Sequence, residues 1–319
     1  MGLWLRHELY DTHLLHSHRV SVPTIGVGNL AVGGTGKTPM TEYLVSLLLS
    51  QGYRVAILSR GYGRKTRGFR LAGPEDTAAT IGDEPMQMHV HFPDVPVAVC
   101  ADRVHGVRQL QKLVPDIQCV VLDDVFQHRR LICGYYVLLT PYDRLYVHDH
   151  LLPLGRLRDL PSQSLRANTI VVTKCPDTMQ PIDCRVVSNK LHLPSYQQLC
   201  FSSIAYQPLY LPGTPLLVTG IAQPQYLLDY VRKQYPDTQL LTFSDHHAFT
   251  KKDITNILSQ AEKFACVLTT EKDYARMQQT PLVEQLGNRL TVMPIAVDFG
   301  DYKAAFDRNI LMYVAENNR

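Results

Sequence analysis

A glycine-rich segment near the amino terminus has the residue types and spacing of a phosphate-binding loop. It fits the pattern G-x-x-x-x-G-K-[ST], except that Ala31 stands in place of the first glycine. Glycines let backbone N–H groups approach a β-phosphate, the helix that follows favours negative charge at its start, Lys37 would neutralise phosphate oxygens, and Thr38 would ligate Mg²⁺. An ordinary glycine-rich turn is the alternative, but the segment lies between a predicted strand and a predicted helix, as a phosphate loop requires. The predicted nucleotide-binding residues are Ala31, Val32, Gly33, Gly34, Thr35, Gly36, Lys37 and Thr38.

Two carboxylates at the end of an apolar run belong to the same chemistry. The run Cys119–Leu122 predicts a buried strand, and Asp123 and Asp124 follow it directly. P-loop enzymes use carboxylates at such a strand end to hold or orient Mg²⁺. A strand that simply ends in solvated aspartates is the alternative. With the phosphate loop, the pair predicts nucleotide phosphate chemistry and leaves the phosphate acceptor open.

Short apolar runs that alternate with helical patterns predict the elements that position these residues. This alternation indicates an α/β fold, with a P-loop NTPase-like parallel sheet sandwiched by helices and a second, smaller α/β domain. We expect the first domain at residues 1–195 and the second at 196–319, closing over the active-site cleft, with a Pro-, Ser- and Tyr-rich connector at 193–215. The predicted strands are 24–27, 54–58, 95–100, 119–122, 135–139 and 169–173, then 215–218, 239–243, 266–269 and 290–297.

Composition sets limits on the partners of the chain. The 319 residues carry 32 basic and 29 acidic side chains, and a net charge of +3 is too balanced for wholesale binding to nucleic acid. Seven scattered cysteines without a C-x-x-C pair indicate reduced thiols and a cytoplasmic protein. No apolar run is long enough to span a membrane, although residues 2–15 could form a short interfacial helix or a frayed surface helix. The histidines at 7, 13, 16 and 18 are expected to be solvated.

Several further motifs, in this order, resemble those of the tetraacyldisaccharide 4'-kinase family. The resemblance covers nearly the whole chain from Pro23 onward. It implies an ATP- and Mg²⁺-dependent kinase that phosphorylates the 4'-hydroxyl of a tetraacylated glucosamine disaccharide 1-phosphate in lipid A synthesis. The motifs are Val27-Gly28-Asn29-Leu30, Gly33 to Pro39, Ser59-Arg60-Gly61-Tyr62-Gly63, Gly82-Asp83-Glu84-Pro85, Asp123 to Arg129 and Thr270-Glu271-Lys272-Asp273.

The resemblance also implies the residues that act on the sugar hydroxyl. Asp83 is the candidate base, with His246 paired to it and His247 as a possible substitute. A hydroxyl needs such an acceptor within hydrogen-bond reach. Read without the resemblance, Asp83 would be a helix N-cap and His246 a surface histidine. If the two residues pair, both domains build one site, and the cleft between them would close on the substrates.

Other positions follow from the resemblance by comparison with the family's L-P-A-G-x-x-R-E pattern and its basic loops. In the segment 152–159, Arg158 would stabilise the transferring phosphate, and Asp159, where a glutamate is usual, would reach Mg²⁺ directly or through water. A surface ion pair between them is the alternative. Arg60, Tyr62 and Arg103 would contact the anionic acceptor.

The resemblance places the protein peripherally at the cytoplasmic face of the bacterial inner membrane, with an anionic glycolipid as substrate and no obligate protein partner. Only about twenty residues precede Pro23, where family members usually carry a longer apolar helix. A competing interpretation is a P-loop GTPase switch or metallochaperone, because Thr173 to Asp177 is similar to a guanine-reading motif. A partitioning-type ATPase is a third, although Val32 stands where that class places a lysine.

Overall fold

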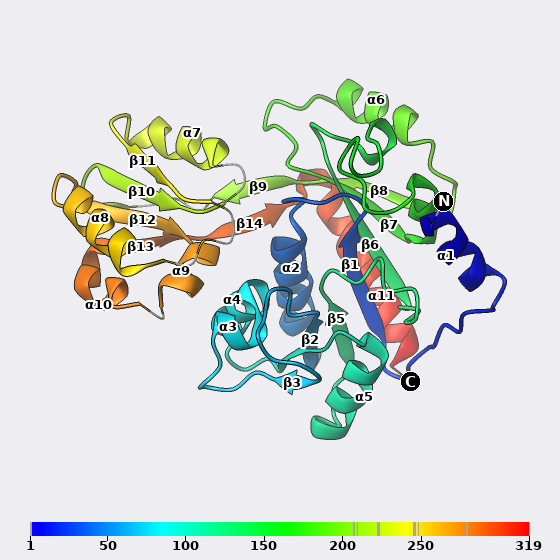
Figure 1. Ribbon diagram of the computed structural model, residues 1–319. Helices are drawn as coiled ribbons and strands as arrows, with labels where there is room; N and C mark the ends of the chain where they lie inside the picture. The colour runs from blue at the N-terminus through cyan, green and yellow to red at the C-terminus, as the bar shows by residue number, and fades with distance from the viewer. Residues whose placement is uncertain are drawn as a thin grey trace.

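The computed structural model shows two α/β lobes joined by a narrow two-stranded ribbon (Figure 1). The first lobe contains an eight-stranded sheet in the order β3-β4-β2-β5-β1-β6-β7-β8, parallel except for β3 at its edge. The second contains a parallel four-stranded sheet in the order β11-β10-β12-β13. The structure describes residues 2–206, 208, 210–221, 224–244, 247, 249–278 and 280–318.

The strands of the first sheet are almost continuous runs of buried residues, as expected for a parallel sheet covered on both faces. One face is covered by α5 (Arg103–Leu113) and α6 (Pro181–Leu191), and the other by α2 (Lys37–Ser50), α4 (Asp83–His91) and α11 (Lys303–Asn317). The strands are β1 (Thr24–Asn29), β2 (Val55–Ser59), β3 (Arg70–Leu71), β4 (Val97–Val99), β5 (Cys119–Leu122), β6 (Tyr135–Pro141), β7 (Thr169–Thr173) and β8 (Gln198–Phe201).

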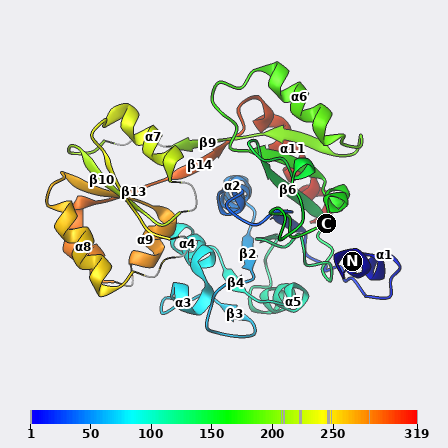
Figure 2. The ribbon, with the colours of Figure 1, turned by 45° about the horizontal axis from the view of Figure 1, so that its top comes forward.

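The second lobe repeats this layered arrangement on a smaller scale. Helix α7 (Gln225–Gln234) covers one face of its sheet, and α8 (Lys251–Ala261) and α10 (Leu282–Leu286) cover the other. Helix α9 (Glu271–Met277) lies on the side that faces α4 of the first lobe (Figures 1 and 2). The strands are β10 (Pro215–Thr219), β11 (Gln239–Thr242), β12 (Cys266–Thr270) and β13 (Leu290–Met293).

The chain crosses between the lobes twice, and this changes the predicted division. Strand β9 (Ser203–Tyr206) leads into the second lobe, and β14 (Ile295–Asp298) returns antiparallel to it. The expected single strand 290–297 is therefore wrong, because Pro294 separates β13 from β14 and the two belong to different sheets. The division expected at 195 and 196 does not coincide with that between the sheets. Strand β8 pairs with β7, and Phe306, Ile310 and Val314 of α11 are buried in the core of the first lobe.

The amino-terminal helix α1 (Gly2–Asp11) docks against the first lobe on the side away from the second lobe (Figure 2). Arg6 donates to the carbonyl of Gln127 at 2.8 Å, and His7 is 3% exposed. The expectation that all four amino-terminal histidines are solvated is wrong for His7. Within the described part of the chain, no helix combines the length and apolarity that crossing a bilayer requires.

The remaining elements are short. Helix α3 (Ala78–Ile81) precedes α4 and packs against it. The 3-10 helices are Tyr146–His148, Pro161–Arg166, Gly287–Arg289 and Gly300–Tyr302.

Candidate active site

The predicted phosphate loop links the end of β1 to the start of α2. Gly33 and Gly36 have φ angles of 105° and 90°, which side-chain-bearing residues rarely adopt. Thr35 is buried and holds the loop in place: its hydroxyl accepts from Asn29 Nδ2 at 2.7 Å, and its carbonyl accepts from the Thr173 hydroxyl at 2.9 Å. Helix α2 has no side-chain cap at Gly36, so its first N–H groups remain available to an anion.

The first position of the loop shows why alanine is tolerated there. Ala31 forms a β-bridge with Leu157, and the N–H of Val32 donates to the carbonyl of Arg156 at 2.8 Å. Unlike Gly33 and Gly36, Ala31 does not have a positive φ. The first position of the loop therefore does not require a glycine. The contacts of Ala31 and Val32 also place the segment around residues 150–158 beside the loop.

Asp123 and Asp124 lie at the carboxyl end of β5 but differ in their surroundings. Burial and the neighbouring Asp124 raise the pKa of Asp123 to about 6, although Ser59 donates to it at 3.1 Å. Burial opposes ionisation of Asp124 too, but Lys37 at 3.9 Å and the guanidinium of Arg158 outweigh it and lower the pKa of Asp124. Asp124 has a φ of 47°, an uncommon conformation that turns its carboxylate toward these cations.

These residues fit a magnesium ion. Two carboxylates and the half-buried Thr38 are hard oxygen donors. Burial, and then the charge of Asp124, raises the pKa of Asp123, and a divalent cation beside the two carboxylates would favour their ionised forms. Thr38, Asp123 and Asp124 are therefore the residues that would hold Mg²⁺ beside the nucleotide phosphates.

Asp159 makes its contacts with other residues, and its predicted role as a magnesium ligand stays a prediction. It is fully buried, and its Oδ1 contacts His7 Nε2 at 2.5 Å and accepts from the Leu160 N–H at 2.9 Å. Arg129 in turn contacts His7 Nδ1 at 3.1 Å. The carboxylate thus anchors α1, and among the described residues it forms no hydrogen bond with the phosphate loop.

Arg158, one residue earlier, lies where the sequence predicts it. Its guanidinium contacts both carboxylate oxygens of Asp124 and donates to Asn29 Oδ1 at 2.6 Å. The side chain is 26% exposed. It is a fixed cation next to the phosphate loop, and it pairs with Asp124 and not with Asp159, so the alternative of an ion pair between Arg158 and Asp159 is not what the structure shows.

Arg103, a predicted contact of the substrate, is buried at the end of β5. Its guanidinium is 2% exposed and donates to the carbonyls of Cys100, Ala101 and Asp124 at 3.0 to 3.2 Å. Burial lowers its pKa to about 10, against the opposing charges of Asp123 and Asp124. Arg103 therefore shapes the strand end that carries the two aspartates, and its contact with the substrate stays a prediction.

Arg60 and Tyr62 are exposed in the loop that follows β2, and Tyr62 is 74% exposed. This loop packs on the start of α4: a Cβ on Gly82 would lie 3.0 Å from the Tyr62 carbonyl oxygen, and Gly82 has a φ of 99°. Because Asp83 follows Gly82, the backbone of Tyr62 lies near the predicted base, and the contacts of Arg60 and Tyr62 with the acceptor stay predictions.

Asp83, the first residue of α4, meets the second lobe. Its Oδ2 accepts from Nε of Arg276 at 2.9 Å and contacts Nη2 at 2.8 Å, and Glu84 pairs with Lys272 at 3.7 Å. The sequence interpretation did not include Arg276. The available signal was its position three residues after Asp273, a spacing that puts the two side chains on one face of a helix.

The two candidate histidines cannot be treated alike. His246 lies outside the described residues, so its predicted pairing with Asp83 stays a prediction. His247 contacts Asp253 at 3.0 Å and stacks on Phe243. These contacts are within the second lobe, so His247 is not a substitute partner for Asp83 in this arrangement.

A second cross-lobe cluster lies near this contact. His91 Nδ1 of α4 is 3.4 Å from Glu42 of α2 and 3.9 Å from Glu271 of α9. The hydrogen bond with Glu42, opposed by burial, raises the pKa of His91, while burial and Glu42 raise the pKa of Glu271. His91 and Glu271 also border a cavity of about 200 Å³ between the lobes.

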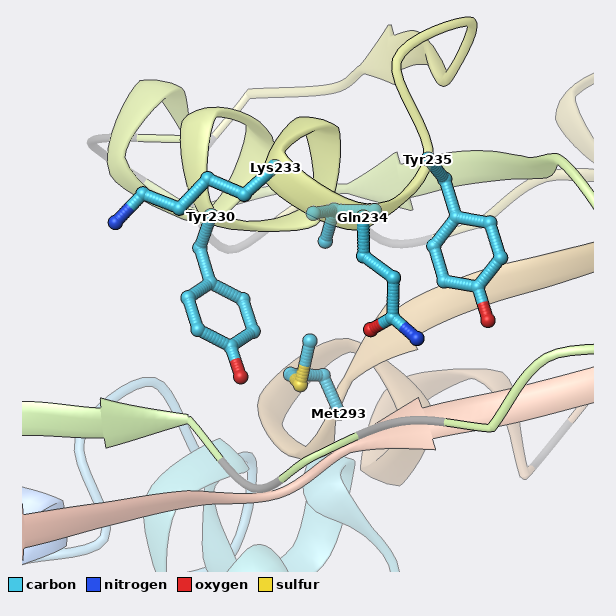
Figure 3. Close-up of a pocket in the computed structure, with 6 residues that line it drawn as sticks. Tyr230, Lys233, Gln234, Tyr235 and Met293 are labelled. Atoms are coloured by element: carbon cyan, nitrogen blue, oxygen red, sulfur yellow. The ribbon is translucent and has the colours of Figure 1, made fainter.

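Another cavity, of about 220 Å³, lies within the second lobe between α7 and β13. Figure 3 shows the side chains of Tyr230 and Gln234 directed from α7 toward Met293. It contains none of the predicted site residues.

The parallel sheet, the phosphate loop after β1 and the aspartates after the neighbouring β5 define the class of P-loop phosphotransferases. The family model described as tetraacyldisaccharide-1-P 4'-kinase matches residues 1–314. The chain belongs to this family, as the sequence resemblance predicts, and the competing switch interpretation gains no support from the comparisons.

Individual relatives agree with the family match. The chain is 42% identical to the tetraacyldisaccharide 4'-kinase of Phocaeicola vulgatus over 341 residues, covering 100% of this chain and 93% of the relative. It is 43% identical to that of Parabacteroides distasonis over 324 residues, covering 94% and 87%. Among solved structures, a crystal structure of LpxK from Aquifex aeolicus in complex with ATP has a TM-score of 0.74 at 24% identity, covering 98% of this chain and 94% of that one. The last similarity confirms the predicted fold.

Proposed function

We propose that this protein transfers the γ-phosphoryl group of ATP to the 4'-hydroxyl of a tetraacylated glucosamine disaccharide 1-phosphate. One observation carries the proposal beyond family membership. Asp83 lies between the lobes on a loop network shared with the phosphate site: Ser59 bonds Asp123, and Gly61, two residues later, packs on Gly82. A carboxylate able to take a hydroxyl proton therefore lies beside the site that binds the nucleotide.

The proposed reaction is an in-line displacement. The N–H groups of the loop and Lys37 bind the triphosphate, and Arg158 stabilises charge on the transferring group. Mg²⁺, held by Thr38, Asp123 and Asp124, would neutralise phosphate charge. Asp83 accepts the proton of the sugar hydroxyl as the hydroxyl oxygen forms a bond to the γ-phosphorus. The bond to the β–γ bridging oxygen breaks, and its electron pair leaves with ADP.

We further propose that the protein works peripherally at the cytoplasmic face of the bacterial inner membrane. The amino-terminal segment supports this location, because it exposes four large apolar side chains while His7 fixes α1 to the body. Arg60 and Tyr62 would contact the polar, anionic part of the lipid. The exposed apolar residues are Trp4, Leu5, Leu14 and Leu15, at 59%, 51%, 72% and 40%.

The experiment supplies γ-labelled ATP, Mg²⁺ and a tetraacylated disaccharide 1-phosphate in detergent, and compares the wild type with Asp83→Ala. We expect labelled lipid from the wild type, reduced by a factor of about 10² to 10⁴ in the variant. Release of labelled phosphate without labelled lipid would contradict the kinase assignment. A lipid blocked at the 4'-hydroxyl serves as the matched control and should take no label.

A further inference from the structure

The carboxylate of Asp83 is held from across the lobe boundary by one guanidinium. Both Nε and Nη2 of Arg276 approach the same oxygen, Oδ2, at 2.9 and 2.8 Å. The Arg276 side chain is 5% exposed, and that of Asp83 is 20% exposed. Two charged donors on one oxygen fix the orientation of a carboxylate far more tightly than a single surface contact does.

Arg276 is itself aimed by a buried network. Its Nη1 contacts Asp273 Oδ1 at 3.1 Å, and Asp273 is fully buried. The other oxygen of Asp273 accepts from the Thr219 hydroxyl, the Gly220 N–H and the Thr270 hydroxyl at 2.7 to 3.0 Å. These donors come from the carboxyl ends of β10 and β12, so the second sheet fixes where the guanidinium points.

The same network leaves no room at Gly220. A Cβ there would lie 2.9 Å from the Ser244 carbonyl oxygen and 3.2 Å from Asp273 Oδ1. Ser244 begins the Ser-Asp-His-His segment that contains the two candidate histidines, His246 and His247. The network that aims Arg276 therefore also packs against the first residue of that segment.

We propose that Arg276 is a positioning residue for the phosphoryl transfer, and that it assembles the base by orienting Asp83 from the second lobe. The proposal rests on the proposed function of Asp83 as base. A neighbouring guanidinium favours the ionised carboxylate, and only that form can accept the hydroxyl proton. Arg276 keeps its own proton throughout and bonds no reacting atom. Base and acceptor site would thus become competent only when the two lobes are together.

A simpler role for Arg276 is that of a strut, a contact that only holds the two lobes together. A neighbouring ion pair allows this role to be distinguished from the positioning of Asp83. Lys272 and Glu84 join the same two helices at 3.7 Å, with side chains 23% and 24% exposed. Lys272→Met weakens the lobe contact without touching Asp83. Arg276→Met removes the guanidinium at similar length, and Arg276→Lys keeps the charge but not the paired donors.

The test measures lipid phosphorylation by the full-length protein and these variants across pH, with melting temperatures to compare folding. For Arg276→Met we expect kcat to fall about 10- to 100-fold with little change in KM for ATP, and the acidic limb of the kcat/KM profile to move to higher pH. Arg276→Lys should recover part of kcat, and Lys272→Met should change kcat less than about threefold. In an Asp83→Asn background, Arg276→Met should lower kcat little further, because the carboxylate that Arg276 orients is already absent.

The outcomes distinguish this inference from the proposed function. If the wild type labels no lipid, the proposed function has failed and the role of Arg276 falls with it. If the wild type is active and Arg276→Met retains its kcat and pH profile, only the role of Arg276 is refuted. Equal losses in Arg276→Met and Lys272→Met, with an unchanged pH profile, would show that Arg276 is a strut.

Discussion

Replacing His7 by alanine should destabilise the protein through Asp159, a residue that the sequence assigns to magnesium. His7 is 3% exposed and Asp159 is fully buried. Without the imidazole, Oδ1 keeps only the Leu160 N–H, and Oδ2 already has no hydrogen-bond partner among the described residues. Stranding one member of a buried pair costs about 3 to 5 kcal/mol. Helix α1 is terminal and can separate to admit water, so we expect a smaller loss of about 2 to 3 kcal/mol.

Thermal unfolding by circular dichroism measures this loss. For a chain of this size it corresponds to a decrease in Tm of roughly 3 to 5 °C. The exposed His16 provides a matched control, because His16→Ala removes a histidine from the same segment and should leave Tm within about 1 °C. The Mg²⁺ concentration for half-maximal activity should not change in His7→Ala or Asp159→Asn. A large increase for Asp159→Asn with unchanged Tm would refute the assignment of Asp159 to the anchoring of α1.

Three further predictions concern the phosphate site and the lobe boundary. The pKa of Asp123 is raised to about 6 from an unfolded value near 3.8, so the stability that this group contributes is present below pH 3.8 and is lost as pH rises through 6. In Asp123→Asn, the free energy of unfolding from urea titration should therefore increase by up to about 3 kcal/mol at pH 8 and not change at pH 3.5. The same variant should lose activity. The hydrogen bond with Glu42 raises the pKa of His91, so the stability that His91 contributes is present below pH 6.5 and is lost as pH rises through the folded pKa. In His91→Gln, the difference in Tm from the wild type should therefore be larger at pH 6 than at pH 9. In Gly28→Ala the new Cβ would lie 2.4 Å from Phe126 Cβ, and a loss of about 2 kcal/mol or more is expected by the same titration.

The sequence predicts features that depend on neighbours along the chain. The phosphate loop needs only eight consecutive residues, and the pair Asp123 and Asp124 needs only the apolar run before it. Both lie where parallel-sheet rules place them, at the carboxyl ends of β1 and β5, which pair directly. Local pattern and sheet geometry were sufficient there because no distant residue decides the outcome.

The contacts that the sequence did not predict depend on partners far away in the sequence. Asp159 contacts His7, which lies 152 positions earlier in the chain. Arg103 is buried because carbonyls around residues 100 and 124 take up its donors. The return of α11 to the first lobe follows from the pairing of β14 with β9, which no periodicity in residues 290–317 reveals. For Asp159 and Arg103, burial and not residue type decides what the charged side chain contacts.

The site is explained by the directions of the two sheets. The phosphate loop, Ser59 and Asp123 follow strands β1, β2 and β5 of the first sheet, while Gly220 and Thr270 mark the ends of β10 and β12 in the second. Parallel strands collect such residues at one edge of each sheet, so each sheet alone offers half of a site. The ion pair between Asp83 and Arg276 is the described contact that joins the halves at the base, from residues 193 positions apart. A catalytic carboxylate oriented by the other lobe makes chemistry conditional on lobe docking, and this would limit phosphoryl transfer to water when the lobes are apart.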